Sequence, residues 1–283
     1  MGTTMTIKSI LVHLNDVRRA QGLLAPAVAL ARQKDAELWG LHVSPGMPLL
    51  AVPAIPYGAD VVDAVAAAER RAADELAVVF RAETGGLGSR AHWRGEQARQ
   101  PDLAECVMQV GRAADLIVAG QADPDWDMAP VLDFPERLAL ESGRPVLMVP
   151  RTGRFDTMSR NLLIAWNGKR EAARAAFDAL ALLEPGSSAR LLVLDDGGGG
   201  AALTAGAELT AQTFRLHGID TDIRVAAIAG RPIGRAILEE CAATGADLLA
   251  MGAYGHTRFR ELVFGGATRY VTHNLAIPTL FSH

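Results

Sequence analysis

The sequence is poor in several residue types that mark specialised classes of protein. Only two cysteines, Cys106 and Cys241, occur in 283 residues, and both fall in segments with a helical pattern. A disulfide framework is therefore excluded, and two isolated thiols favour a reducing cytoplasm. No run of 18 apolar residues is present, so we expect no membrane span and no membrane partner. The segment 7–14 resembles a strand, without the apolar stretch of a signal peptide.

Positive charge and the usual catalytic motifs are also missing. The formal net charge is −4, whereas proteins that bind nucleic acid carry a basic face, so we expect no nucleic-acid partner. The seven histidines show no spacing typical of a zinc site, and no metal ligand is assigned. The sequence contains neither a Gly-x4-Gly-Lys-Ser/Thr loop nor a Gly-x-Ser-x-Gly elbow. We therefore assign no catalytic residue.

Short apolar segments recur in the same order. Residues 10–16, Ile-Leu-Val-His-Leu-Asn-Asp, match residues 162–168, Leu-Leu-Ile-Ala-Trp-Asn-Gly. Residues 113–120 match residues 245–252, which share the run Ala-Asp-Leu. Each half then closes with an apolar strand that starts at a proline: Pro145–Val149 and Pro278–Phe281. Three matches in one order predict two copies of a single unit.

Apolar strands alternate with helical patterns in both halves. In the second half the predicted strands are 161–166, 190–194, 222–227, 247–251 and 278–281. The helices predicted between them are 170–183, 202–217, 232–243 and 266–274. This alternation predicts an α/β fold with two tandem, doubly wound, parallel five-stranded sheets. We place the domains at 1–151 and 158–283, with a polar linker between them, and expect an irregular loop around Pro45, Pro48, Pro53 and Pro56.

Glycines cluster after the fourth strand of the second half. In an open parallel sheet, ligands bind beyond the carboxyl ends of the strands, where the strand order reverses. Gly252 and Gly255 permit close approach of the backbone to a ligand. Gly265 and Gly266 expose N–H groups at a helix N-terminus, which favours phosphate. The segment between these glycines adds possible donors: His256, Arg258 and Arg260.

The spacing Gly-x2-Gly-x9-Gly, formed by Gly252, Gly255 and Gly265, resembles the nucleotide-binding signature of the universal stress protein family. The resemblance covers nearly the whole chain in two copies, as in tandem members of that family. It implies a Rossmann-like fold similar to that of adenine nucleotide alpha hydrolases. It also implies ATP or AMP as the ligand, with Mg²⁺ as an optional companion.

The resemblance further implies which residues contact the nucleotide. They are Trp166 and Asn167 after the first strand, Leu194 and Asp195 after the second, and Gly252, Gly255, His256, Gly265, Gly266, Ala267 and Thr268 in the glycine segment. Three positions depart from the family pattern, which has Asp at Asn167, an apolar residue near Asp195, and Ser or Thr at Gly266. Asn167 still offers a donor and an acceptor, and Gly266 keeps its N–H. Asp195 and Asp196 suit either a magnesium ion or a solvated turn.

The corresponding segment of the first half, 120–127, is different. It lacks the second glycine and carries three carboxylates, which would repel a triphosphate: Asp123, Asp125 and Asp127. We therefore expect the first half to be structural or to bind another ligand. His13 and His42 lie on predicted strands, where packing is a better explanation for them than catalysis.

These observations favour a cytoplasmic stress-response protein that binds an adenine nucleotide in its second half and acts by conformation or association. The resemblance allows slow ATP hydrolysis at most. Two alternatives remain open: a ligand-free interaction module, and binding of another small molecule by the first half. If the halves form an intramolecular pseudo-dimer, their final strands should meet across a pseudo-twofold axis. A further homodimer is compatible with this arrangement.

Overall fold

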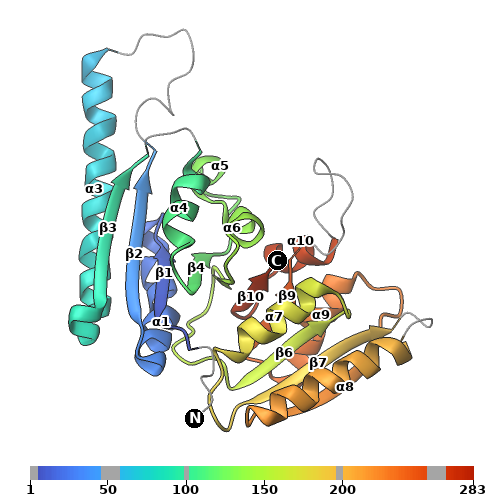
Figure 1. Cartoon of the computed structure of the whole chain (residues 1–283). Coiled ribbons are helices and arrows are strands. Elements are labelled where there is room, and N and C mark those ends of the chain that lie inside the picture. Colours follow the sequence, from blue (N-terminus) through green and yellow to red (C-terminus); the bar gives the residue numbers. More distant parts are fainter. Residues whose placement is uncertain (1–5, 46–57, 99–101, 196–199, 254–265) are drawn as a thin grey trace.

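A computed structural model of the chain describes residues 6–45, 58–98, 102–195, 200–253 and 266–283. Within these residues, ten strands form one continuous sheet that is flanked by helices. The first and second halves of the chain lie side by side (Figure 1). Residues 150–160, which connect them, contain neither helix nor strand.

The described residues of the first half form five strands and five α-helices. The strands are β1 (Ser9–His13), β2 (Glu37–Ser44), β3 (Ala91–Gln97), β4 (Leu116–Gly120) and β5 (Val146–Val149). The helices are α1 (Val17–Lys34), α3 (Ala59–Thr84), α4 (Leu103–Gly111), α5 (Ala129–Leu132) and α6 (Pro135–Glu141), with a 3-10 turn at Gly85–Arg90.

In the second half, the part of the chain that the structure describes contains five strands and four helices. The strands are β6 (Asn161–Trp166), β7 (Ser188–Asp195), β8 (Asp220–Ala227), β9 (Leu248–Gly252) and β10 (Thr279–Ser282). The helices are α7 (Arg170–Leu180), α8 (Gly200–Leu216), α9 (Ile233–Thr244) and α10 (Gly266–His273). The predicted strands lie within two residues of these bounds. The observed helix α7 ends three residues before the predicted end at residue 183, because residues 181 and 182 form a turn.

The strand order is β3-β2-β1-β4-β5-β10-β9-β6-β7-β8. From either edge to the centre, the strands of each half follow the same order: third, second, first, fourth, fifth. All neighbours within a half are parallel, as predicted. β5 and β10 pair antiparallel, with Leu280 opposite Leu147. The prediction that the final strands meet is therefore confirmed, and the two predicted sheets are joined into one.

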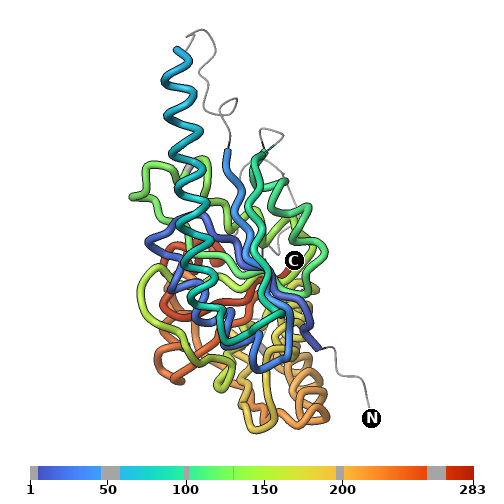
Figure 2. The backbone as a smooth tube through the Cα atoms, turned by 90° about the vertical axis from the view of Figure 1, so that its left-hand side faces the viewer, coloured from blue at the N-terminus to red at the C-terminus, as the bar shows by residue number. Residues whose placement is uncertain are grey.

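Helices cover both faces of the sheet. One buried cluster joins the sheet to α1, α3, α7 and α8, and the other joins it to α4, α6, α9 and α10. The prolines expected to form an irregular loop lie largely outside the described residues, since Pro48, Pro53 and Pro56 fall in 46–57. The helix that follows them, α3, rises beyond the end of the sheet (Figure 2).

Candidate functional site

A cavity of about 470 Å³ lies at the carboxyl ends of the second-half strands. β7 lies on one side of β6 and β9 on the other, so the strand order reverses at β6. Openings of this kind are the usual ligand sites of doubly wound sheets. The volume is within the range of about 300–1,000 Å³ that small-molecule sites occupy.

The floor of the cavity is apolar. β6 contributes Ala165, β7 contributes Leu192 and Leu194, and β9 contributes Met251. Leu192 and Leu194 point the same way because side chains alternate between the two faces of a strand. Ile237 of α9 completes this side of the cavity. A planar apolar group would therefore find dispersion contacts on several sides.

The rim of the cavity is formed by the starts of three helices. Lys169 precedes α7, Pro232 precedes α9, and Gly266 begins α10, and all three residues line the cavity. The first N–H groups of a helix have no partner inside that helix, so each helix start carries about half a positive charge. Lys169 adds a full positive charge, and none of the described lining residues is a carboxylate. The rim therefore favours an anion.

The structure brings together most of the predicted site residues. Seven of them line the cavity: Trp166, Asn167, Leu194, Gly252, Gly266, Ala267 and Thr268. Asp195 ends β7 next to this group but does not line the cavity. Gly255, His256, Gly265, Arg258, Arg260 and Asp196 lie outside the described residues.

Two first-strand residues have clear structural tasks. The indole Nε1 of Trp166 donates to the carbonyl of Leu203 at 3.2 Å, which fixes the ring as a wall between the cavity and α8. The side-chain Oδ1 of Asn167 accepts the backbone N–H of Lys169 at 3.0 Å. Asn167 thereby shapes the turn into α7, a task for which its amide serves as well as a carboxylate.

Gly252 has a packing role that the sequence did not indicate. A Cβ at this position would lie 2.7 Å from the carbonyl carbon of Glu171 and 2.8 Å from the backbone nitrogen of Ala172. Glycine is therefore needed for α7 to pack against the end of β9, and the same residue lines the cavity. At Gly266, in contrast, a Cβ would meet no atom within 4 Å in the part of the chain that the structure describes.

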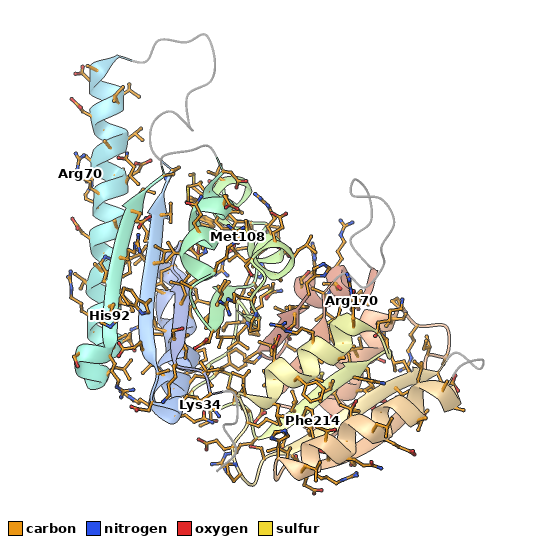
Figure 3. The ribbon with its side chains drawn as sticks, viewed as in Figure 1. Lys34, Arg70, His92, Met108, Arg170 and Phe214 are labelled. Atoms are coloured by element: carbon orange, nitrogen blue, oxygen red, sulfur yellow. The ribbon has the colours of Figure 1, made fainter. Side chains whose placement is uncertain are left out.

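Sequence reasoning missed Lys169 and the start of α9. Arg170, the next residue after Lys169, also lies at the start of α7 (Figure 3). It does not line the cavity, and its Nε donates to Glu171 at 2.6 Å. Pro232 marked a helix start in the sequence, but only the topology places that start beside the end of β6.

In the equivalent region of the first half, the described side chains contact one another. His13, which matches Ala165 in the repeat, stacks on Phe134 with ring centroids 5.1 Å apart. Burial, with smaller contributions from His42 and Arg19, lowers the pKa of His13 to about 3. Nδ1 of His42, which is also buried, lies 2.8 Å from the carbonyl of Leu14. Both histidines are packed, as expected from the sequence.

A buried carboxylate lies beside this stack. Asp133 accepts the backbone N–H of Asp123 at 2.6 Å and an N–H of Arg19 at 3.3 Å. The amide of Asn15, the counterpart of Asn167, donates to the carbonyl of Leu132 at 2.7 Å and lies 3.4 Å from Asp133. Burial raises the pKa of Asp133, and these donors act against that rise. The N–H groups of Asp123, Arg19 and Asn15 are thus directed at the carboxylate of Asp133.

The cysteines give no sign of reactivity. Cys106 is half-buried and Cys241 is buried. Burial raises the pKa of the Cys241 thiol to about 12, which keeps it protonated.

Among the described residues, no group of three or more His, Cys, Asp or Glu side chains is placed to hold a metal ion. None of the described helices is both long enough and apolar enough to cross a membrane.

Residues 158–283 match the model of the universal stress protein family. Curated protein sequences give no significant match. A universal stress protein structure from Archaeoglobus fulgidus DSM 4304 has a TM-score of 0.74 and 16% identity, and covers 98% of this chain and 96% of its own. A putative universal stress protein from Pseudomonas aeruginosa UCBPP-PA14 has a TM-score of 0.58 and 16% identity, covering 99% and 95%.

A shorter structure, the universal stress protein from Archaeoglobus fulgidus in complex with dAMP, has a TM-score of 0.33 and 17% identity. It covers 51% of this chain and 99% of its own. The two full-length matches show that the tandem α/β fold of this chain, with its mostly parallel sheet, is the fold of universal stress proteins.

Proposed function

We propose that this protein, whose residues 158–283 form a universal stress protein domain, binds one adenine nucleotide per chain in the second-half cavity. ATP or AMP is the ligand, and the protein acts through conformation or association in a cytoplasmic stress response. Efficient turnover is not part of the proposal, because no His, Cys, Asp or Glu side chain lines the cavity among the described residues.

The observation that carries this proposal is the arrangement of charge around an apolar floor. Helix starts and Lys169 surround one side of the cavity, whereas Leu192, Leu194 and Met251 form the other. A ligand that fits both sides needs an anionic end and a flat apolar end. A nucleotide has both, and phosphate groups are bound at helix N-termini in many folds.

The residues present fit the phosphates better than they fit a separate metal. Lys169 can donate to a phosphate oxygen, and Gly266 lines the cavity as the first residue of α10, where helix N–H groups lack partners inside the helix. Asp195 does not line the cavity. Mg²⁺ would therefore enter with the phosphates, and the described lining residues offer it no carboxylate ligand.

The first half is not a second nucleotide site in this proposal. Asp133 already takes the donors of Arg19 and of the Asp123 backbone, and Phe134 packs on His13. An incoming phosphate would have to displace a buried carboxylate. The alternative in which the first half binds a different molecule gains no support from this closed arrangement.

Isothermal titration with ATP and AMP tests the proposal. We expect one site per chain for the whole protein. Lys169→Ala should weaken ATP binding by about 10-fold or more, since a charge-assisted hydrogen bond contributes about 1.5–3 kcal/mol. Arg170→Ala is the matched control: it removes a neighbouring cation that does not line the cavity, and it should change the affinity little. Two sites per chain, equal effects of the two substitutions, or no binding at all would contradict the proposal.

A further inference from the structure

Gln121 connects the first half to the helix that borders the second-half cavity. It follows β4 directly, and only 4% of its surface is exposed. Its side-chain Nε2 donates to the carbonyls of Thr272 and His273, at 2.9 and 3.0 Å, and these are the last two residues of α10. Its Oε1 accepts the backbone N–H of Arg151 at 3.1 Å. A residue of one half thus caps a helix of the other.

The two carbonyls need such a partner because they lie at a helix C-terminus. The last four carbonyls of a helix receive no hydrogen bond from inside it. In α10, the carbonyls of Tyr270 and Val271 accept the backbone N–H of Asn274 at 3.1 Å. The next two carbonyls receive the amide of Gln121. A buried carbonyl without a donor destabilises the folded chain, so the bond from Gln121 to the buried Thr272 holds this helix end in place.

The opposite end of α10 lines the cavity. Gly266, Ala267 and Thr268 are its first three residues, and all of them border the cavity. A helix of eight residues is about 12 Å long and moves as a stiff rod. α9 supports this rod from the side: a Cβ at Gly234 would lie 2.8 Å from the carbonyl oxygen of Ala267. The position of the C-terminal end therefore sets where the N-terminal N–H groups point.

Gln121 is itself held in place by the first half. Its backbone N–H donates to the carbonyl of Val149 at 2.8 Å, and its backbone carbonyl accepts a hydrogen bond from Arg19. Arg19 in turn pairs with the buried Asp133. In the repeat the counterpart of Gln121 is Ala253, whose side chain cannot form such bonds. At this pair of equivalent positions, only the first half therefore provides a side chain that caps a helix of the other half.

We propose that Gln121 is a positioning residue for the second-half cavity, because it holds α10 by its C-terminal end and so fixes the anion-binding end of that helix. The effect on a ligand rests on the nucleotide binding proposed above. The effect on α10 rests on the hydrogen bonds alone. The first half thus serves as a built-in partner that completes the site of the second.

The test compares Gln121→Met with a matched glutamine on the same junction. Met keeps the length of the side chain but removes both donors. Gln33 also belongs to the first half and donates to a second-half carbonyl, that of Leu182, at 3.3 Å. The next residue, Lys34, which Figure 3 labels, donates to the carbonyl of Leu183. Neither Leu182 nor Leu183 belongs to α10. Gln33→Met is therefore the control for a lost hydrogen bond between the halves.

Two measurements are made on the full chain: ATP affinity by isothermal titration, and amide hydrogen exchange of residues 266–273. We expect Gln121→Met to weaken ATP binding by about five-fold or more, at the low end of couplings between sites, and to speed exchange in α10. Gln33→Met should change neither. A general loss of stability does not explain such a result as long as the variant stays folded. The measured affinity then falls only if fewer molecules have the conformation that binds ATP.

Replacing the donor separates positioning from simple packing. Gln121→Lys restores a donor to the helix C-terminus and should recover most of the affinity, whereas Gln121→Glu places a carboxylate against the carbonyls and should bind ATP most weakly. An unchanged ATP affinity in Gln121→Met overturns the inference and leaves the proposed function intact. If the wild-type protein does not bind ATP, the proposed function fails. Hydrogen exchange then decides alone: faster exchange in α10 of Gln121→Met only supports the positioning role, and unchanged exchange overturns it.

Discussion

Gly266→Asp should separate folding from ligand binding at a single position. Gly266 is the first residue of α10 and borders the cavity, and a Cβ there would meet no atom of the described residues within 4 Å. The aspartate therefore fits without displacing a neighbour. A carboxylate in the first turn of a helix interacts favourably with the N–H groups, by about 0.3–1 kcal/mol. We expect the ligand-free protein to be as stable as the wild type or slightly more stable.

The same carboxylate would occupy the place proposed for phosphate. Two unit charges of equal sign 4 Å apart repel by about 1 kcal/mol in bulk water and by about 4 kcal/mol at an effective dielectric constant of 20. The rim of the cavity is partly enclosed, so the cost should lie between these limits for each phosphate charge nearby. ATP affinity should therefore fall by about 10- to 1,000-fold, since each 1.4 kcal/mol corresponds to a factor of ten.

Thermal unfolding with and without ATP measures both effects at once. At about 100 times its dissociation constant, ATP should stabilise the wild type by about 2.7 kcal/mol. In a chain of this size that corresponds to a rise in Tm of about 4–5 °C. Gly266→Asp should lose this rise, while Gly266→Asn, which has the same shape without charge, should retain it. An undiminished ATP shift in Gly266→Asp would mean that nucleotide binds elsewhere.

Three further predictions concern the fold. Ending the chain before Pro278 removes β10 and uncovers both β5 and β9, so the truncated chain should aggregate or lose cooperative unfolding; a soluble chain with one sharp transition would refute this. Gly252→Ala should lower the free energy of unfolding by about 1–3 kcal/mol in urea titrations because its Cβ would overlap the backbone of α7, whereas Gly266→Ala should not. The pKa of His13 is lowered by burial to about 3 from 6.5, so the native state binds fewer protons and stability falls as the pH drops below 6.5. Between pH 7 and 5.5 this effect should lower the free energy of unfolding by about 1 kcal/mol. In urea titrations of His13→Leu this contribution should be absent.

The sequence by itself determined the repeated architecture. The matched segments 10–16 and 162–168 became β1 and β6 with the turns that follow them, and the strands after Pro145 and Pro278 became the central pair. These features are readable because apolar runs and helical periods report local burial, which each segment carries in its own residues. The glycine segment likewise directed attention to the edge of the sheet where the cavity lies, since the carboxyl ends of parallel strands share one side.

Only the tertiary structure decided what surrounds the site. The start of α9 and Lys169 reach the cavity because the strand order places β7 and β9 on either side of β6, and no local pattern encodes that order. The closure of the first half depends on Asp133 meeting Arg19 across more than a hundred residues of chain. Gln121 reaches α10 for the same reason: such contacts are made by side chains that only the folded topology brings together.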